Sequence, residues 1–167
     1  CKYNGPDRPP EQLERVVLGS SGIINEHGMR VIRSDECELV ITTAGVSDMI
    51  AMQALIPEEY IDRIAVVTNA CGCQDIPSNA LAMFRGKPTV VVHDADVPGQ
   101  EGARLWCIAL QGVTPSVKNL QLFEQVEETH GPDLRDWIEN GGTFEEFLAL
   151  VGHCPVFTPD ESELTDE

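Results

Sequence analysis

This sequence has few positively charged residues and no long apolar stretch. It contains 11 Lys and Arg residues against 28 Asp and Glu residues, which gives a formal net charge of −17. This balance argues against a surface that coats nucleic acid generally, because non-specific binding to phosphate comes from Lys and Arg. The longest apolar runs, such as Val90-Val91-Val92, are strand-sized, whereas a membrane span needs roughly 18 apolar residues. We therefore expect no membrane span, and any nucleotide chemistry would need a metal ion or a partner to supply positive charge.

The chain also lacks the signals of a disulfide scaffold, a zinc ribbon and a secretory leader. Its six cysteines are scattered and form no CxxC pair: Cys1, Cys37, Cys71, Cys73, Cys107 and Cys154. Scattered thiols are typical of a reducing cytosol, and no basic segment followed by an apolar one opens the chain, so we expect a cytoplasmic location. The lone CxC of Cys71 and Cys73 is either a pair of small loop residues or a weak metal or redox signal.

Apolar residues make up 42% of the 167 residues, which suits one folded domain with one hydrophobic core. The pattern divides the chain into an N-terminal extension over 1–37, an α/β domain over 38–152 and an acidic tail over 153–167. The extension is predicted to hold a short helix over 10–18 and a small β-hairpin over 23–32. The tail is expected to be disordered, because it is rich in acidic and turn-forming residues. Since the chain begins at Cys1 and not at Met, we expect a fragment or a processed form of a longer protein.

Strands alternate with helices in the α/β domain. Strands are predicted over 38–43, 64–68, 89–93 and 116–122, and helices over 46–55, 77–84, 99–112, 134–139 and 144–151. The strands are nearly continuous apolar runs, which indicates a mostly parallel sheet of about four strands covered by helices on both faces. Such sheets bind ligands at the carboxyl ends of their strands. We therefore expect the site just after Thr43, Thr68, His93 and Leu122.

Two carboxylates, Asp94 and Asp96, follow the third predicted strand. On an extended chain this spacing points both side chains the same way. Their charges would repel, and a divalent cation between them would relieve the repulsion. Mg²⁺ (or Mn²⁺) is the natural choice for an all-oxygen site that also holds phosphates. The alternative is that both are turn residues that cap the next helix.

The other strand ends carry weaker signals. Gly99 and Gly102, like Gly45, stand at predicted helix starts, where accessible backbone amides would bind phosphate; a plain tight turn explains them at least as well. Asp48 lies one turn into its helix, and either faces the crevice or is an acid favoured by the helix dipole. Asn69 contacts a ligand or forms a turn.

Together these segments resemble the TOPRIM domain of DNA primases and primase-helicases. That family has an apolar strand ending in Glu-Gly, an acid four residues after the Glu, and a later strand ending in Asp-x-Asp before glycines that open a helix. The matching residues here are the strand Leu39 to Thr43, then Gly45 and Asp48, then Asp94-Ala95-Asp96 with Gly99 and Gly102. Residues 131–138 with Gly141-Gly142-Thr143 are similar to the end of the family's conserved region. The resemblance covers about residues 38–151.

The resemblance implies a Rossmann-like TOPRIM fold and Mg²⁺-dependent nucleotidyl transfer in primer synthesis. It implies that Asp94 and Asp96 hold the metal, with Asp133 as a further ligand and Asp48 as a secondary carboxylate. The implied partners are nucleotides and single-stranded DNA, bound through the parent protein, and the other domains of a primase or helicase.

The chain departs from the family at Ala44, where the family has its Glu. That Glu is taken to serve as metal ligand or general acid/base, a role worth about 10²–10⁴-fold in rate, and alanine can do neither. The chain is then a naturally degenerate domain, an engineered inactive variant, or a relative that uses another carboxylate, for which Asp48, Asp75 and Asp133 are candidates.

Three functions therefore stay open. The first is primase-type nucleotidyl transfer, impaired by Ala44. The second is a catalytically inactive module of the same fold that binds a metal, a nucleotide or a protein partner. The third is an unrelated doubly wound protein such as a phosphoacceptor, which would want a Lys at a later strand end; Lys118 lies within its predicted strand, so this option is poor.

Overall fold

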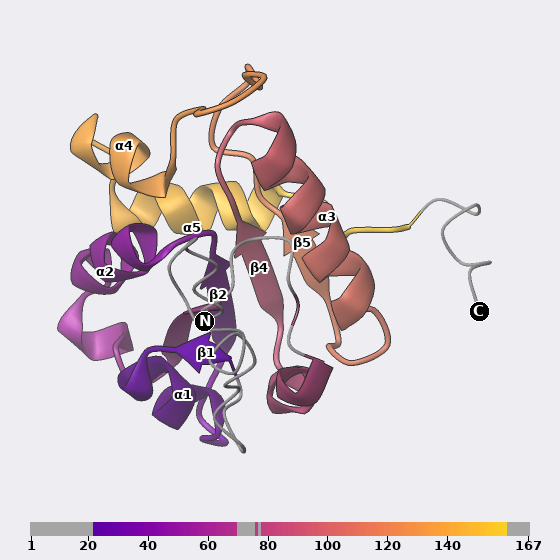
Figure 1. Cartoon of the computed structure of the whole chain (residues 1–167). Helices are drawn as coiled ribbons and strands as arrows, with labels where there is room; N and C mark the ends of the chain where they lie inside the picture. The colour runs from indigo at the N-terminus through magenta and orange to yellow at the C-terminus, as the bar shows by residue number, and fades with distance from the viewer. Residues whose placement is uncertain (1–21, 70–75, 77, 160–167) are drawn as a thin grey trace, which may run out of the picture.

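The computed structural model describes residues 22–69, 76 and 78–159. The helix predicted over 10–18, Cys1, the CxC of Cys71 and Cys73, Asp75 and the tail from 160 lie outside these residues. The described part holds one five-stranded sheet in the order β1-β3-β2-β4-β5 (Figure 1). The strands are β1 (Ile23–Ile24), β2 (Leu39–Thr43), β3 (Ile64–Asn69), β4 (Thr89–Val92) and β5 (Val117–Asn119). Only β1 is antiparallel to its neighbour β3, so the predicted mostly parallel α/β fold is confirmed.

Helices cover both faces of this sheet (Figure 1). They are α1 (Glu26–Ile32), α2 (Val46–Leu55), α3 (Val97–Leu110), α4 (Leu134–Glu139) and α5 (Phe144–His153), with 3-10 helices η2 (Glu58–Tyr60) and η3 (Ser78–Phe84). One core cluster joins α1, η3 and α3 to the sheet, and the other joins α2, α4 and α5 to its opposite face. Successive residues of one strand alternate between the clusters: Val91 belongs to the first, and Val90 and Val92 belong to the second. The continuous apolar runs in the sequence reflect this burial on both faces.

The β-hairpin predicted over 23–32 is wrong. Ile23 and Ile24 pair with Asn69 and Thr68 of β3, and the chain then turns directly into α1. Gly28 lies within α1 and packs so closely on β3 that an added Cβ would lie 2.1 Å from the Val66 carbonyl oxygen. Docking of α1 on the sheet thus overrides the local turn preference of its residues.

The C-terminal part of the described chain completes the fold. Thr143 caps α5 in a capping box, in which its side chain accepts from the Glu146 amide. His153 ends α5, and the Phe157 amide donates to the Val117 carbonyl, so residues after α5 run along the β5 edge. Among the described helices, none has both the length and the apolar character that crossing a bilayer requires.

Candidate functional site

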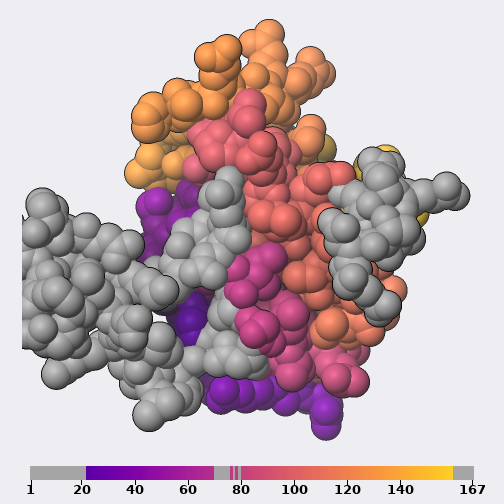
Figure 2. Space-filling model, turned by 45° about the vertical axis from the view of Figure 1, so that its right-hand side comes forward, coloured from indigo at the N-terminus to yellow at the C-terminus, as the bar shows by residue number. Residues whose placement is uncertain are grey.

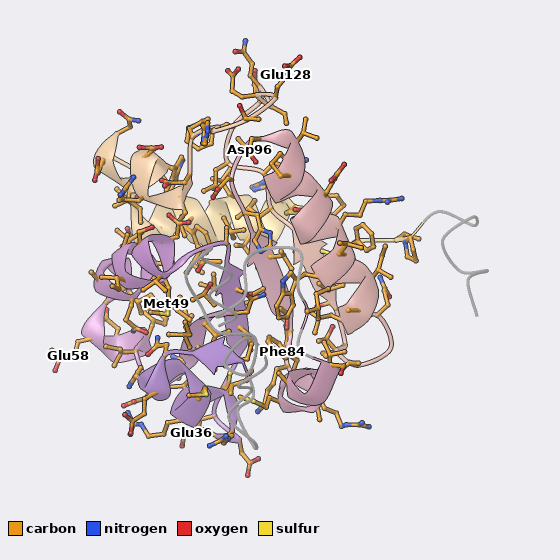
Figure 3. The ribbon with its side chains drawn as sticks, viewed as in Figure 1. Glu36, Met49, Glu58, Phe84, Asp96 and Glu128 are labelled. Atoms are coloured by element: carbon orange, nitrogen blue, oxygen red, sulfur yellow. The ribbon has the colours of Figure 1, made fainter. Side chains whose placement is uncertain are left out.

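Four aspartates gather where the parallel strands end. Asp94 and Asp96 follow β4, Asp48 lies in the first turn of α2 after β2, and Asp133 stands at the N-cap of α4. Figure 3 labels Asp96 at this end of the molecule, and Glu36 at the opposite end. The structure therefore brings Asp48 and Asp133 close to the Asp94 and Asp96 pair, although both are far from it in the sequence.

The charges of these aspartates act on one another. Asp48 is only 3% exposed; burial raises its pKa to about 6, and the charges of Asp133 and Asp94 contribute to the same shift. Burial also raises the pKa of Asp94, and Asp96, Asp133 and Asp136 raise it further. Like charges held together with little water disfavour the ionised form, so the site carries electrostatic strain that a bound cation would relieve.

Arg135 supplies positive charge beside this cluster. Its amide donates to Asp48 Oδ1 at 3.3 Å, and its charge lowers the pKa of Asp48 against the larger effect of burial. Its guanidinium lies 3.4 Å from Asp133 Oδ2 and 3.8 Å from Glu139 Oε1, with the side chain 48% exposed. One half-exposed arginine leaves the cluster strongly negative.

Asp96 differs from Asp94 in its surroundings. Its Oδ1 accepts from the Gly99 amide at 2.8 Å, and its Oδ2 accepts from the Gly131 amide at 3.3 Å. Asp96 is thus the N-cap of α3, as the alternative sequence interpretation held. Asp94 makes no such cap and is half-buried, so of the two it has the carboxylate more available to a ligand.

The predicted phosphate-binding residues lie at the same end of the sheet. Helix α3 begins at Val97, two residues before the predicted start, so Gly99 and Gly102 are buried within its first turns and the Gly99 amide is bound to Asp96. An added Cβ on Gly99 would lie 2.5 Å from the Asp94 carbonyl oxygen, which explains the glycine by packing. Gly45 is the extended N-cap of α2, and Asn69 is buried at the end of β3.

His93 is buried at the end of β4. Its Nδ1 donates to the Gly99 carbonyl oxygen at 3.3 Å, because a carbonyl oxygen can only accept. Burial lowers the pKa of His93 to about 4. The imidazole is therefore neutral at physiological pH and adds no positive charge to the aspartates.

The sequence placed the site partly after Leu122 and at Asp133, but it did not predict how the loop that connects β5 to α4 holds the residues after β4. The Glu127 amide donates to the Ala95 carbonyl and the Val97 amide donates to the Glu127 carbonyl, while the Ala95 amide donates to the Pro132 carbonyl at 2.9 Å. The segment that contains this loop stands out at one end of the molecule (Figure 2). The loop thus clamps the Asp94-Ala95-Asp96 turn through backbone hydrogen bonds, for which the sequence gives no direct signal.

The donor set suits a hard divalent cation in part. All the side-chain donors are carboxylate oxygens, which Mg²⁺ prefers. Within the described residues, however, no three His, Cys, Asp or Glu side chains are grouped so that they could hold an ion by themselves. Mg²⁺ is commonly held by one or two carboxylates, with water and substrate phosphates completing its shell. The cluster fits that mode and not a closed cage of protein ligands.

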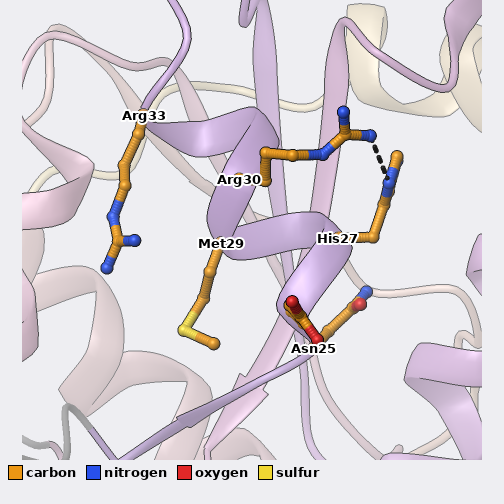
Figure 4. Close-up of a pocket in the computed structure, with 6 residues that line it drawn as sticks. Asn25, His27, Met29, Arg30 and Arg33 are labelled. Carbon is orange, nitrogen blue, oxygen red and sulfur yellow. Dashed lines mark hydrogen bonds between the residues drawn. The ribbon is translucent and has the colours of Figure 1, made fainter.

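A pocket of about 720 Å³ lies elsewhere, along α1. Its basic lining residues Arg30 and Arg33 point to different sides of the helix (Figure 4). The Arg30 guanidinium is bound to His27 Nδ1 at 2.9 Å and to Asp62 at 3.2 Å. The two arginines therefore do not converge on a common anion.

This chain resembles known proteins in its structure but not in its sequence. No protein-family model and no curated protein matches it. The zinc-binding and RNA polymerase domains of the Aquifex aeolicus primase match with a TM-score of 0.57 and 16% identity, over 78% of this chain and 28% of that one. Two structures containing bacteriophage T7 primase domains match less well. One, in complex with the lagging-strand DNA polymerase, an RNA/DNA hybrid and dTTP, has a TM-score of 0.49 and 16% identity over 72% of this chain and 56% of that one.

The other, the primase fragment of the T7 primase-helicase, has a TM-score of 0.46 and 17% identity over 71% of this chain and 45% of that one. The chain therefore spans between 28% and 56% of the length of these matched chains. At such low identity the likeness concerns the fold. The chain has a primase-type fold. At the level of the fold, this confirms the resemblance to primases that the sequence indicated.

Proposed function

We propose that this chain is the TOPRIM-like module of a DNA primase-related replication protein, and that its acidic site binds Mg²⁺ or Mn²⁺ for nucleotidyl transfer in primer synthesis. The observation that carries this proposal is the gathering of Asp48, Asp94 and Asp133 at the carboxyl edge of a primase-type sheet, with the pKa values of Asp48 and Asp94 raised by burial and by their mutual charges. Ligands of open α/β sheets bind at this edge.

Asp94 and Asp133 are the side chains that would hold the ion, with Asp96 beside them. A bound ion would neutralise and orient the triphosphate of a nucleotide. Asp96 keeps the turn in place by capping α3 and binding the Gly131 amide. The half-exposed Arg135 guanidinium is placed to contact a phosphate, since it stands beside Asp133 with part of its surface open to solvent.

Ala44 is expected to weaken any transfer reaction. It stands at the turn between β2 and α2, where the family has its Glu. Asp48, a candidate substitute from the sequence, accepts from the Arg135 amide at the start of α4, so we do not assign it the role of that Glu. Nucleotides and single-stranded DNA would be gripped by other domains of the parent protein, because the module is acidic.

Calorimetric titration with Mn²⁺ and Mg²⁺ tests the metal site. Asp94→Asn preserves the side-chain shape but removes the charge, and it spares the helix cap that Asp96 provides. We expect the parent chain to bind Mn²⁺ and Asp94→Asn to bind it at least about tenfold more weakly, the loss of roughly 1.4 kcal/mol. Asp62→Asn, which alters an exposed ion pair with Arg30, is the control and should bind as the parent does. Absence of binding by the parent, or equal binding by Asp94→Asn, would overturn the proposal.

A catalytically inactive module with the same metal or nucleotide site is the second candidate. Ala44 and the net charge of −17 favour it. Ala44→Glu separates the two functions: an active relative should gain Mn²⁺ affinity and nucleotidyl transfer on a single-stranded template, whereas an inactive module gains at most affinity.

A further inference from the structure

Residues 131–136 enter α4 and carry Asp133, and the loop after β4 holds this segment from one side. The Ala95 amide donates to the Pro132 carbonyl at 2.9 Å, and Asp96 Oδ2 accepts from the Gly131 amide at 3.3 Å. An added Cβ on Gly131 would lie 2.0 Å from the Ala95 carbonyl oxygen, so the two backbones are in close contact. These contacts fix the chain just before Asp133 relative to Asp94.

Helix α2 holds the same segment from the other side. Asp48 Oδ1 accepts from the Arg135 amide, in the first turn of α4, at 3.3 Å. The first amides of a helix have no partner within the helix, and Asp133 Oδ1 satisfies the next one, that of Asp136, at 2.8 Å. Asp48 thus acts as a second, long-range acceptor at the start of α4.

The Asp48 contact has a function that apolar packing cannot supply. Met49 and Met52 of α2 share a core cluster with Leu134 of α4, and this packing holds the helices together. Apolar contact is non-directional, so it does not fix how α4 is rotated and shifted along α2. A hydrogen bond to one particular amide does, and it aligns the start of α4, including Asp133, with the end of β4.

We propose that Asp48 is a positioning residue: its Oδ1 anchors the first turn of α4 and so holds Asp133 opposite Asp94. This inference rests on the proposed function for the use of Asp133 as a ligand. Asp48 itself acts through α4, and its charge is not required for the anchoring.

Two substitutions at Asp48 separate anchoring from charge. Asp48→Asn keeps an oxygen that accepts from the Arg135 amide, whereas Asp48→Ala removes it. In Asp48→Ala the Arg135 amide should exchange with solvent about tenfold faster, as expected for a lost hydrogen bond, and Mn²⁺ affinity should fall about 10–100-fold, as for other residues that orient metal ligands. Asp48→Asn should stay close to the parent chain in both measurements.

A double-mutant cycle with Asp133 provides the readout that a merely structural role would not change. If Asp48 acts through Asp133, Asp48→Ala should cost no further affinity once Asp133→Ala is present. Thr143→Ala is the matched control: it opens the capping box of the neighbouring α5 and should leave Mn²⁺ affinity unchanged.

The proposal is overturned if Asp48→Asn binds Mn²⁺ as weakly as Asp48→Ala, because the charge would then act directly. It is equally overturned if Asp48→Ala leaves the Arg135 amide protected. The exchange measurement needs no metal. A parent chain that binds no Mn²⁺ would therefore refute the proposed function, while amide exchange alone would still uphold or reject the anchoring of α4.

Discussion

At the scale of single residues, burial decides the chemistry of the groups around β4. His93 has a pKa lowered to about 4 and Asp48 a pKa raised to about 6, in both cases mainly because a charge is costly where water is excluded. The two groups affect folding stability in opposite directions as the pH falls. His93 is protonated more readily in the unfolded chain, and Asp48 more readily in the folded one.

The first prediction concerns His93. Its stabilising contribution is complete above the ordinary pKa of 6.5 and is lost as the pH falls toward 4; that difference corresponds to about 3 kcal/mol. His93→Asn should therefore lose less stability than the parent between pH 7 and pH 4.5, measured by urea unfolding without divalent ions. Parallel pH profiles for the two proteins would contradict this.

The second prediction concerns Asp48. Its folded pKa of about 6 exceeds the ordinary value of 3.8, so the folded state gains stability as the pH falls through 6 and partly offsets the loss at His93. Asp48→Asn removes this gain and should make the decline in stability toward pH 4.5 steeper than in the parent. The same urea-unfolding series measures this decline. A shallower decline in Asp48→Asn than in the parent would contradict the raised pKa of Asp48.

The third prediction concerns Gly131. A methyl group there would collide with the Ala95 carbonyl, so Gly131→Ala should lower the free energy of unfolding by about 1–3 kcal/mol, as for other overpacked sites. Gly152→Ala is the control. It lies within α5 with nothing within 4 Å of the added Cβ, and it should be neutral or stabilising, because alanine favours helix more than glycine does.

At the scale of elements, the sequence predicted the helices and strands whose pattern of apolar residues extends over the whole segment. Helix α2 has the predicted bounds, and the apolar runs of β2, β3 and β4 are close to theirs. Helix α1 was missed because it is short and its Glu26-His27-Gly28 start is typical of a turn; its stability comes from packing on β3. The candidate site was likewise predicted only where a local pattern indicated it. Strand ends located the aspartates, whereas the Asp48 contact with α4 depends on residues far apart in the chain.

The fourth prediction separates the two roles of Asp133. It caps α4, and we propose that it also binds metal. Serine is an equally good cap but a poor ligand, so Asp133→Ser should keep the stability of the parent while losing Mn²⁺ affinity. Asp133→Ala should lose affinity and also about 1 kcal/mol of stability. Thermal unfolding and calorimetry on both variants check this; full Mn²⁺ affinity in Asp133→Ser would limit Asp133 to its capping role.

At the scale of the whole molecule, charge and fold have to be reconciled. The chain has a primase-type fold, yet its formal net charge is −17 and its carboxylates gather at the edge where ligands of such sheets bind. Phosphate would be repelled from this edge unless a cation were bound there. We therefore propose that a divalent ion occupies the aspartate cluster.

Paramagnetic broadening by Mn²⁺ in amide NMR spectra tests this claim most directly, because it locates the ion. We predict that substoichiometric Mn²⁺ broadens the amides of residues 94–96, Gly131 and residues 133–136, leaves those of α1 sharp, and loses this effect in Asp94→Asn. Broadening spread over exposed acidic residues such as Glu36 and Glu58, or unchanged in Asp94→Asn, would contradict a specific metal site at the end of β4.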